Sequence, residues 1–184
     1  MEKQLQLLIE QERKLSGLRY AMWLENGIFT VRWWLITALL FLPWVFWFAA
    51  VDKRRLQEMT LYAFATSLIA ITLDEIGSSL QLWIYPIHVI PLLPRLITIN
   101  YTLVPIIYTL VYQHFPTWKV FIAANLILAF IFAFVLEPIL VWAKLYVLLR
   151  WQYAYSAPLY FFAAVFLKWF MKKLKNKQGK FQKA

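Results

Sequence analysis

Long apolar stretches separated by short polar or charged segments dominate the chain after residue 32. The clearest begins at Trp33 and reads WWLITALLFLPWVFWFAAV, without a charge, as far as Val51. A helix that crosses a bilayer needs about 20 mostly apolar residues. The pattern therefore predicts an all-α membrane bundle of five transmembrane helices, at residues 33–51, 59–84, 96–112, 120–142 and 158–171.

The two ends of the chain differ from this pattern. In residues 1–30, a partial helical stripe among Gln, Glu, Lys and Arg is formed by Leu5, Leu8, Leu15 and Leu18. This spacing predicts an amphipathic N-terminal helix and a turn, with the helix lying on the membrane or on the other helices. Residues 31–171 then form one five-helix transmembrane domain, and residues 172–184 form a basic tail.

Composition supports the membrane class. Of 184 residues, 62% are hydrophobic and only 15% are charged, whereas an average soluble domain is roughly half apolar and about a quarter charged. This excludes a soluble enzyme, a disordered chain and a basic nucleic-acid-binding domain. The chain has no cysteine, two histidines and four glycines. We therefore expect no metal, no cofactor and no phosphate-binding glycine loop.

The net charge of +10 is unevenly placed along the sequence. Three basic residues, Lys53, Arg54 and Arg55, follow the first expected span, and the tail is rich in lysine. Basic residues in short loops mark the cytoplasmic side. Five spans then place the N-terminus outside and the C-terminus in the cytoplasm. The tail lysines are expected to contact anionic lipids of the bilayer.

Three carboxylates interrupt the expected spans. Asp74 and Glu75 lie in the second, Glu137 lies at a similar depth in the fourth, and Arg95 stands at the start of the third on the same side. An ionisable group inside a bilayer costs several kcal/mol, so it usually faces the bundle interior and finds a partner. We therefore predict one polar site, with Arg95 as the counter-ion of the carboxylates.

Two further side chains belong to the predicted site. Ser78 follows Asp74 by four residues and extends its polar helix face, and Tyr101 lies near the same level in the third span. The leading hypothesis is that this site binds a small ligand, a cation or a proton, with translocation as an extension.

Other interpretations of the same residues stay open. Arg95 with Asp74 or Glu137 could form a structural ion pair in a non-catalytic subunit. A carboxylic acid in an apolar pocket could instead serve as a general acid in an enzyme acting on a lipid or an isoprenoid. Small residues four apart on the fourth span would allow close helix packing, as in a homodimer or with a membrane partner.

Several segments resemble a family of small multi-pass membrane proteins of spore-forming Gram-positive bacteria. They are LDEIGSSLQLWIYP, PLLPRLITINYTLVPIIYTLVYQHFPTWK, FAFVLEP and YSAPLY, within roughly residues 31–170. The resemblance implies a bacterial plasma-membrane setting and no particular chemistry. A weaker similarity to small membrane carotenoid cyclases adds little to the enzyme alternative, because their proline-then-glutamate order is reversed in Glu137-Pro138.

Overall fold

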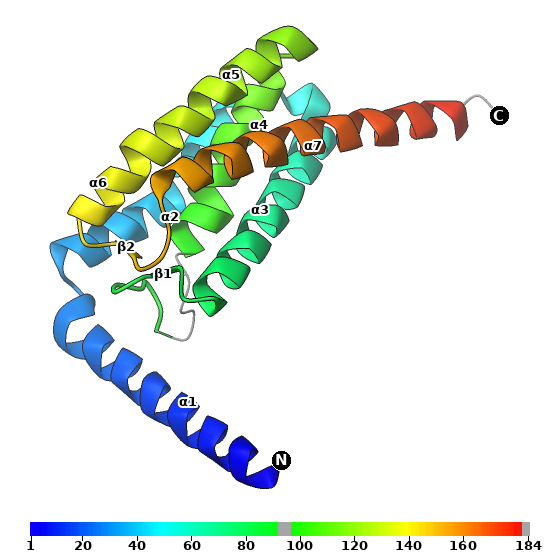
Figure 1. Cartoon of the computed structure of the whole chain (residues 1–184). Coiled ribbons are helices and arrows are strands. Elements are labelled where there is room, and N and C mark those ends of the chain that lie inside the picture. Colours follow the sequence, from blue (N-terminus) through cyan, green and yellow to red (C-terminus); the bar gives the residue numbers. More distant parts are fainter. Residues whose placement is uncertain (92–96, 182–184) are drawn as a thin grey trace.

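The chain is almost entirely helical in the computed structural model, which describes residues 1–91 and 97–181 (Figure 1). One antiparallel strand pair, Trp83↔Leu148 and Ile84↔Val147, is added to the helices. In chain order the elements are α1 (Glu2–Met22), η1 (Trp23–Gly27), α2 (Val31–Ala50), η2 (Lys53–Arg55), α3 (Leu56–Ser79), β1 (Trp83–Ile84), η3 (Ile99–Leu103), α4 (Val104–His114), α5 (Trp118–Ile131), η4 (Phe132–Leu136), α6 (Glu137–Trp142), β2 (Val147–Leu148) and α7 (Tyr153–Phe181).

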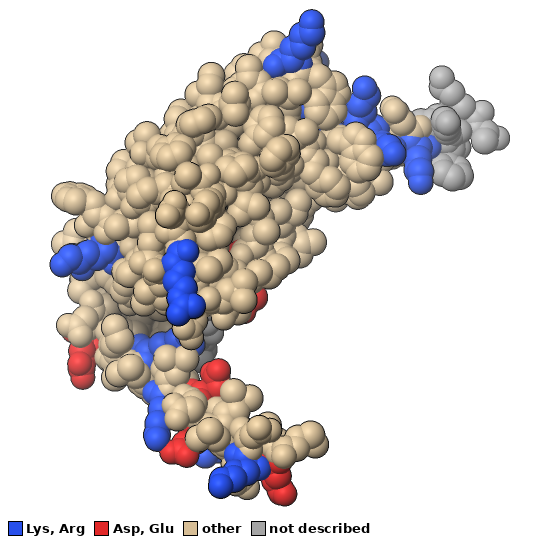
Figure 2. Space-filling view, in the orientation of Figure 1, with Lys and Arg blue, Asp and Glu red and all other residues tan. Residues whose placement is uncertain are grey.

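Four helical segments in the described residues are long and apolar enough to cross a membrane. They are Val31–Ala50, Lys53–Ser79, Trp118–Trp142 and Tyr153–Gln178. Figure 2 shows a broad band of uncharged surface over the bundle, with lysine and arginine at its two ends and mixed charges along α1. An all-helical chain with four helices long and apolar enough to cross a membrane is therefore confirmed.

The expected span at 96–112 corresponds to η3 and α4, which are not among these four segments. α4 packs against α2, α3 and α5, and buries side chains around most of its circumference. η3 and α4 together run from Ile99 to His114, a shorter helical stretch than the four segments above, and residues 92–96 before them lie outside the described residues. The fifth crossing therefore stays a prediction.

The helix ends divide the bundle into two regions. At one end, which we call the β end, α3 and α6 finish and β1 and β2 pair (Figure 1). At the other, which we call the Glu58 end, η2 leads into α3, α4 is joined to α5, and α7 continues toward the C-terminus.

α3 and α6 end in the same kind of turn. After α3, Leu82 N–H bonds to the Gly77 carbonyl, and Gln81 adopts a positive φ of 54°. After α6, Leu145 N–H bonds to Leu140 and Lys144 has φ 57°. These are Schellman caps, in which one left-handed residue closes the helix. Each cap turns the chain into one strand of the β pair.

α1 is a helix, as predicted for residues 1–30, but it extends away from the bundle (Figure 1). All of α1 is described, and none of its residues is buried. The chain that follows is attached to the loop after β1, because Nε1 of Trp23 donates to the His88 carbonyl and Nε1 of Trp33 donates to the Val89 carbonyl, both at 3.1 Å. The amphipathic role of α1 stays a prediction.

Candidate functional site

A cavity of about 340 Å³ lies between α3 and α7 and reaches the β end. η3 with α4, α6, and the loops that carry β1 and β2 supply its other walls. Most lining side chains are apolar, and a few polar ones converge among them. This combination is typical of a ligand-binding pocket. The polar residues that line it include Asp74, Asn100, Glu137, Tyr146, Ser156 and Tyr160.

Asp74 is buried, with 6% of its surface exposed, and bonds to segments far along the chain. Its Oδ1 accepts from Nε1 of Trp83 at 2.9 Å and from the Tyr85 hydroxyl at 2.6 Å. Its Oδ2 accepts from the side-chain amide of Asn100 at 2.7 Å. Burial, followed by the neighbouring Asp74 charge, raises the pKa of the Tyr85 phenol and so keeps it a proton donor. Asp74 therefore anchors two segments to α3: the loop that follows this helix, and η3.

Gly77 makes the contact between Trp83 and Asp74 sterically feasible. A Cβ at Gly77 would lie 2.0 to 2.7 Å from three carbon atoms of the Trp83 ring, far inside any real contact. The indole therefore lies directly on the glycine backbone, one helical turn beyond Asp74. Glycine is required here for close approach rather than for backbone freedom.

Glu137 is the second buried carboxyl of the cavity, 5% exposed. Its Oε1 accepts from the Tyr160 hydroxyl of α7 at 2.6 Å. Within the described residues, its Oε2 is buried and has no hydrogen-bond partner. The Ser156 hydroxyl is a further hydrogen-bonding neighbour of this carboxyl, although no bond of normal length reaches Oε2, and it accepts from Nε1 of Trp151 at 2.9 Å. A buried carboxyl oxygen without a partner is costly, so a ligand donor at this oxygen would recover free energy.

Tyr146 connects the two carboxyl groups electrostatically. Burial, and then the charges of Glu137 and Asp74, raise the pKa of its phenol. Its ring stacks on that of Tyr85, with centroids 5.4 Å apart. The two carboxyls thus lie within electrostatic reach of one phenol, at the same end of the cavity.

Two π-helical turns shape the walls beside these groups. η3 contains Asn100 and precedes Pro105, and η4 ends immediately before Glu137 and Pro138. Proline cannot donate the backbone hydrogen bond of a regular helix, so a wider turn before it accommodates the missing donor. A π turn also rotates the side chains around it, and such turns are frequent at functional sites.

The structure brings together only some of the predicted site residues. Asp74 and Glu137 line the same cavity. Glu75 is exposed and accepts from the Ser79 hydroxyl at 3.1 Å. Ser78 and Tyr101 are not among the described lining residues, and 48% of the Tyr101 surface is exposed. Arg95 lies outside the described residues, so its predicted role as counter-ion stays a prediction.

Several side chains of the site carry no signal that singles them out in the sequence. Asn100 and Tyr160 each bond to a carboxyl from a distant helix, at separations of 26 and 23 residues. Tyr160 is one of ten tyrosines, and spacing alone does not distinguish it. Asn100 is the exception, because a polar amide within an apolar stretch is costly to bury unless it is hydrogen-bonded. That cost alone could have suggested that Asn100 has a polar partner inside the bundle.

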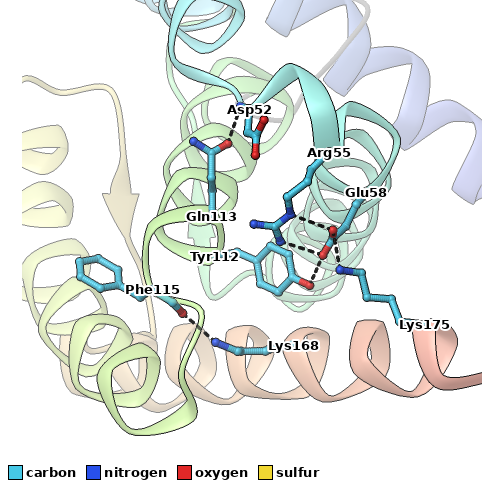
Figure 3. Close-up of polar contacts among 8 residues, drawn as sticks. All are labelled: Asp52, Arg55, Glu58, Tyr112, Gln113, Phe115, Lys168 and Lys175. Carbon is cyan, nitrogen blue, oxygen red and sulfur yellow. Dashed lines mark hydrogen bonds and ion pairs between the residues drawn. The ribbon is translucent and has the colours of Figure 1, made fainter.

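A second polar cluster occupies the Glu58 end (Figure 3). Arg55 donates to both carboxylate oxygens of Glu58 at 3.0 Å, and the Tyr112 hydroxyl donates to Oε1 at 2.6 Å. Lys175 of α7 completes the cluster, 2.6 Å from Oε2. Glu58 therefore connects α3 with α4 and α7, and none of the partners named here is among the described residues that line the cavity.

Lys168 lies near this cluster and joins α7 to the connection between α4 and α5 (Figure 3). It is 6% exposed, and its ammonium donates to the carbonyl of Phe115 at 2.8 Å. The same ammonium lies 4.0 Å from the centre of the Phe121 ring. A cation at the carbonyl end of α4 stabilises that helix terminus.

In the part of the chain that the structure describes, no three of His, Cys, Asp and Glu gather closely enough to hold a metal ion. No protein-family model, curated protein or solved structure matches the chain. The similarity to membrane proteins of spore-forming Gram-positive bacteria stays a prediction. Function is therefore argued from the chemistry of the cavity.

Proposed function

We propose that this protein is a small integral membrane protein that binds a ligand bearing a cationic or hydrogen-bond-donating group in the cavity between α3 and α7. The observation that carries the proposal is the buried Oε2 of Glu137, which lines the cavity and has no partner among the described residues. A bound donor would satisfy this oxygen. A cation or a proton carried through the same site is an extension of this function.

The two carboxyls have different parts in this proposal. Asp74 accepts three hydrogen bonds and holds the wall of the cavity in place. Glu137 presents its second oxygen to the ligand, while Tyr160 orients the first at 2.6 Å. Because one carboxyl positions the wall and the other contacts the ligand, substitutions at the two residues should have different consequences.

The membrane arrangement that we propose has five crossings. η3 with α4 supplies the fifth, which places the Glu58 end, the basic residues 53–55 and the tail in the cytoplasm. α1 then lies outside along the membrane surface, and the tail lysines contact anionic lipid headgroups. The β end, with the cavity, lies toward the outer side of a bacterial plasma membrane.

The proposal is tested by identifying what co-purifies with the protein. Native mass spectrometry of the full chain released from its membrane should detect a bound cationic or donor-bearing species. Glu137→Gln should lose it, because a charge-assisted hydrogen bond contributes roughly 1.5 to 3 kcal/mol, equivalent to about 10-fold to 100-fold in affinity. The matched control Glu75→Gln changes an exposed carboxylate of α3 and should retain the species.

Two results would contradict the proposal. Equal occupancy in the wild type, Glu137→Gln and Glu75→Gln would show that Glu137 contacts no ligand. A co-purified lipid whose mass changes on incubation with the wild type, and not with Glu137→Gln, would instead identify an enzyme with Glu137 as the acid.

A further inference from the structure

The cavity reaches the outer surface of the bundle between two membrane-spanning helices. Three of its lining residues are substantially exposed: Ile76 and Leu80 at α3, with 52% and 62% of their surfaces exposed, and Leu159 on α7, with 38% exposed. α3 and α7 both belong to segments long enough to cross a membrane. Exposed leucine and isoleucine on such helices face lipid, so the cavity adjoins the bilayer between them.

The cavity is elongated along the helix axes. On α3 its lining runs from Thr66 to Leu80, which at the helical rise is about 21 Å. On α7 it runs from Ser156 to Leu167, or about 17 Å. A volume near 340 Å³ spread over this length gives a narrow space. Its shape suits a single flexible chain better than a compact molecule.

Polarity is divided along this length. The carboxyls of Asp74 and Glu137 and the amide of Asn100 lie toward the β end. Toward the middle of the bundle, most wall side chains are apolar, such as Ile69, Ala164 and Leu167. The hydroxyls of Thr66 and Tyr108 also line this part, but each donates to a backbone carbonyl, so the deeper part is largely apolar. A ligand that matches both parts has a polar head group at one end and an apolar chain at the other.

The head group is defined by the buried Oε2 of Glu137, which has no hydrogen-bond partner in the described residues. Among the described lining residues there is no lysine or arginine, and Glu137 takes part in no ion pair within the described residues. A carboxyl buried in a membrane protein is stabilised by a partner of opposite charge. An ammonium group has three donors, of which one can reach Oε2.

We propose that the ligand is a single-chain amphiphile with a primary ammonium head group, and that it enters from the bilayer between α3 and α7. This inference rests on the proposed function, since it names the ligand class and the entry route of the same site. The ammonium donates to Oε2 of Glu137, and the chain occupies the apolar part of the cavity toward Leu167.

The ligand class is tested with three probes added to the full-length protein in nanodiscs of neutral phosphatidylcholine. They are dodecylamine, propylamine with the same head group, and dodecanoic acid with a chain of the same length. Dodecylamine should raise the apparent melting temperature of the wild type and of Glu75→Gln. In Glu137→Gln its apparent affinity should fall about 10-fold or more.

The outcomes separate this inference from the proposed function. Equal effects of propylamine and dodecylamine, both lost in Glu137→Gln, would overturn the amphiphile while leaving a donor site at Glu137. Binding of dodecylamine that is identical in Glu137→Gln and the wild type would overturn the amphiphile as a Glu137 ligand. The proposed function would then be judged by the co-purified species alone.

The entry route is tested by narrowing the opening. Leu159→Trp adds a bulky ring at the lipid-facing edge of the cavity, and Ile127→Trp adds the same ring on α5, where the residue is 62% exposed and is not among the described lining residues. Stopped-flow tryptophan fluorescence follows binding, because Trp83 and Trp151 line the cavity. Leu159→Trp should slow dodecylamine association several-fold and Ile127→Trp should not. Equal rates in both variants would overturn entry between α3 and α7.

Discussion

Two buried carboxyls of similar exposure have unlike surroundings. Asp74 accepts from an indole, a phenol and an amide, whereas Glu137 accepts from one phenol, has the Ser156 hydroxyl nearby, and has no bond of normal length at Oε2 within the described residues. Full satisfaction of the hydrogen-bonding capacity is typical of a structural residue. An unsatisfied buried acceptor requires another explanation, and a ligand donor supplies it.

Asp74→Asn should therefore reduce stability rather than affinity alone. The asparagine keeps one acceptor oxygen for Trp83 and Tyr85, but its amide group then faces the amide donor of Asn100. The loss of charge-assisted bonds should cost about 1 to 3 kcal/mol. The apparent melting temperature in detergent should fall clearly further for Asp74→Asn than for Glu75→Gln, because only Asp74 is buried. Equal melting temperatures for the two variants would contradict the anchoring role of Asp74.

Gly77→Ala tests the packing of the Trp83 indole against the backbone of α3. The added methyl group would lie 2.0 Å from a ring atom, so the indole must move and its bond to Asp74 must lengthen. Overpacking of this kind costs typically about 1 to 3 kcal/mol. The thermal unfolding midpoint should fall accordingly.

The matched control for that prediction is Gly17→Ala. No described atom lies within 4 Å of a Cβ at Gly17, and alanine is the better helix former by about 1 kcal/mol. Gly17→Ala should be neutral or mildly stabilising. A drop of equal size in both variants would indicate that glycine-to-alanine changes act through the helices in general rather than through Trp83.

At the residue scale, the ionisable groups could be found in the sequence because charge in a span is rare. The direction in which each of these side chains points from its helix was harder to predict. Asp74 and Glu75 are adjacent, and adjacent residues point about 100° apart on a helix. Only one of the pair can face the cavity, and the sequence does not say which. Tyr160 could not be predicted, because its role depends on how α7 packs against α6.

At the scale of the elements, the prolines explain where the regular helices change. Pro105 and Pro138 each follow a π-helical turn beside the cavity, η3 and η4. The sequence predicted a span across each proline, the fourth one interrupted at Glu137 and Pro138, and it predicted no π-helical turn. The hydropathy pattern records which residues are apolar, and it does not record a local change in helical hydrogen bonding, which arises from the missing donor of proline.

The Schellman caps give a prediction about helix ends. Lys144 adopts a positive φ of 57° without being glycine, which costs an L-residue about 1 to 2 kcal/mol. Lys144→Gly should therefore raise the apparent melting temperature by an amount equivalent to about 0.5 to 1 kcal/mol, after the greater chain entropy of glycine is subtracted. Lys119→Gly, in the first turn of α5, should lower it by about 1 kcal/mol instead. A lower melting temperature for both would contradict the strain at Lys144.

At the scale of the whole molecule, the membrane class follows from composition, whereas the number of crossings depends on how a single helix is packed. α4 buries Tyr108, Thr109 and Tyr112 among other helices, and with η3 it extends only from Ile99 to His114. A hydropathy pattern does not record where a helix begins and ends, so it cannot separate a short helix at the bundle centre from one that crosses the membrane completely.

The orientation is tested with single cysteines, because the natural chain has none. Five crossings predict that a membrane-impermeant maleimide labels Gln11→Cys on α1 in intact cells, and labels Asn176→Cys on α7 only after permeabilisation. Phe130→Cys, on the lipid-facing side of α5, is the unlabelled control. Labelling of both termini from the same side would contradict an odd number of crossings.

The β pair and the Glu58 cluster together impose a mechanical condition on the molecule. Near the β end, Trp83 and Leu148 connect the chain after α3 to the chain before α7. At the Glu58 end, Lys175 of α7 is held by Glu58 of α3 at 2.6 Å. Because α3 and α7 are connected near both ends, they cannot separate by a hinge motion at one end. The distance between them can increase only at mid-length, through bending of the helices, unless the strand pair or the Glu58–Lys175 ion pair is first broken.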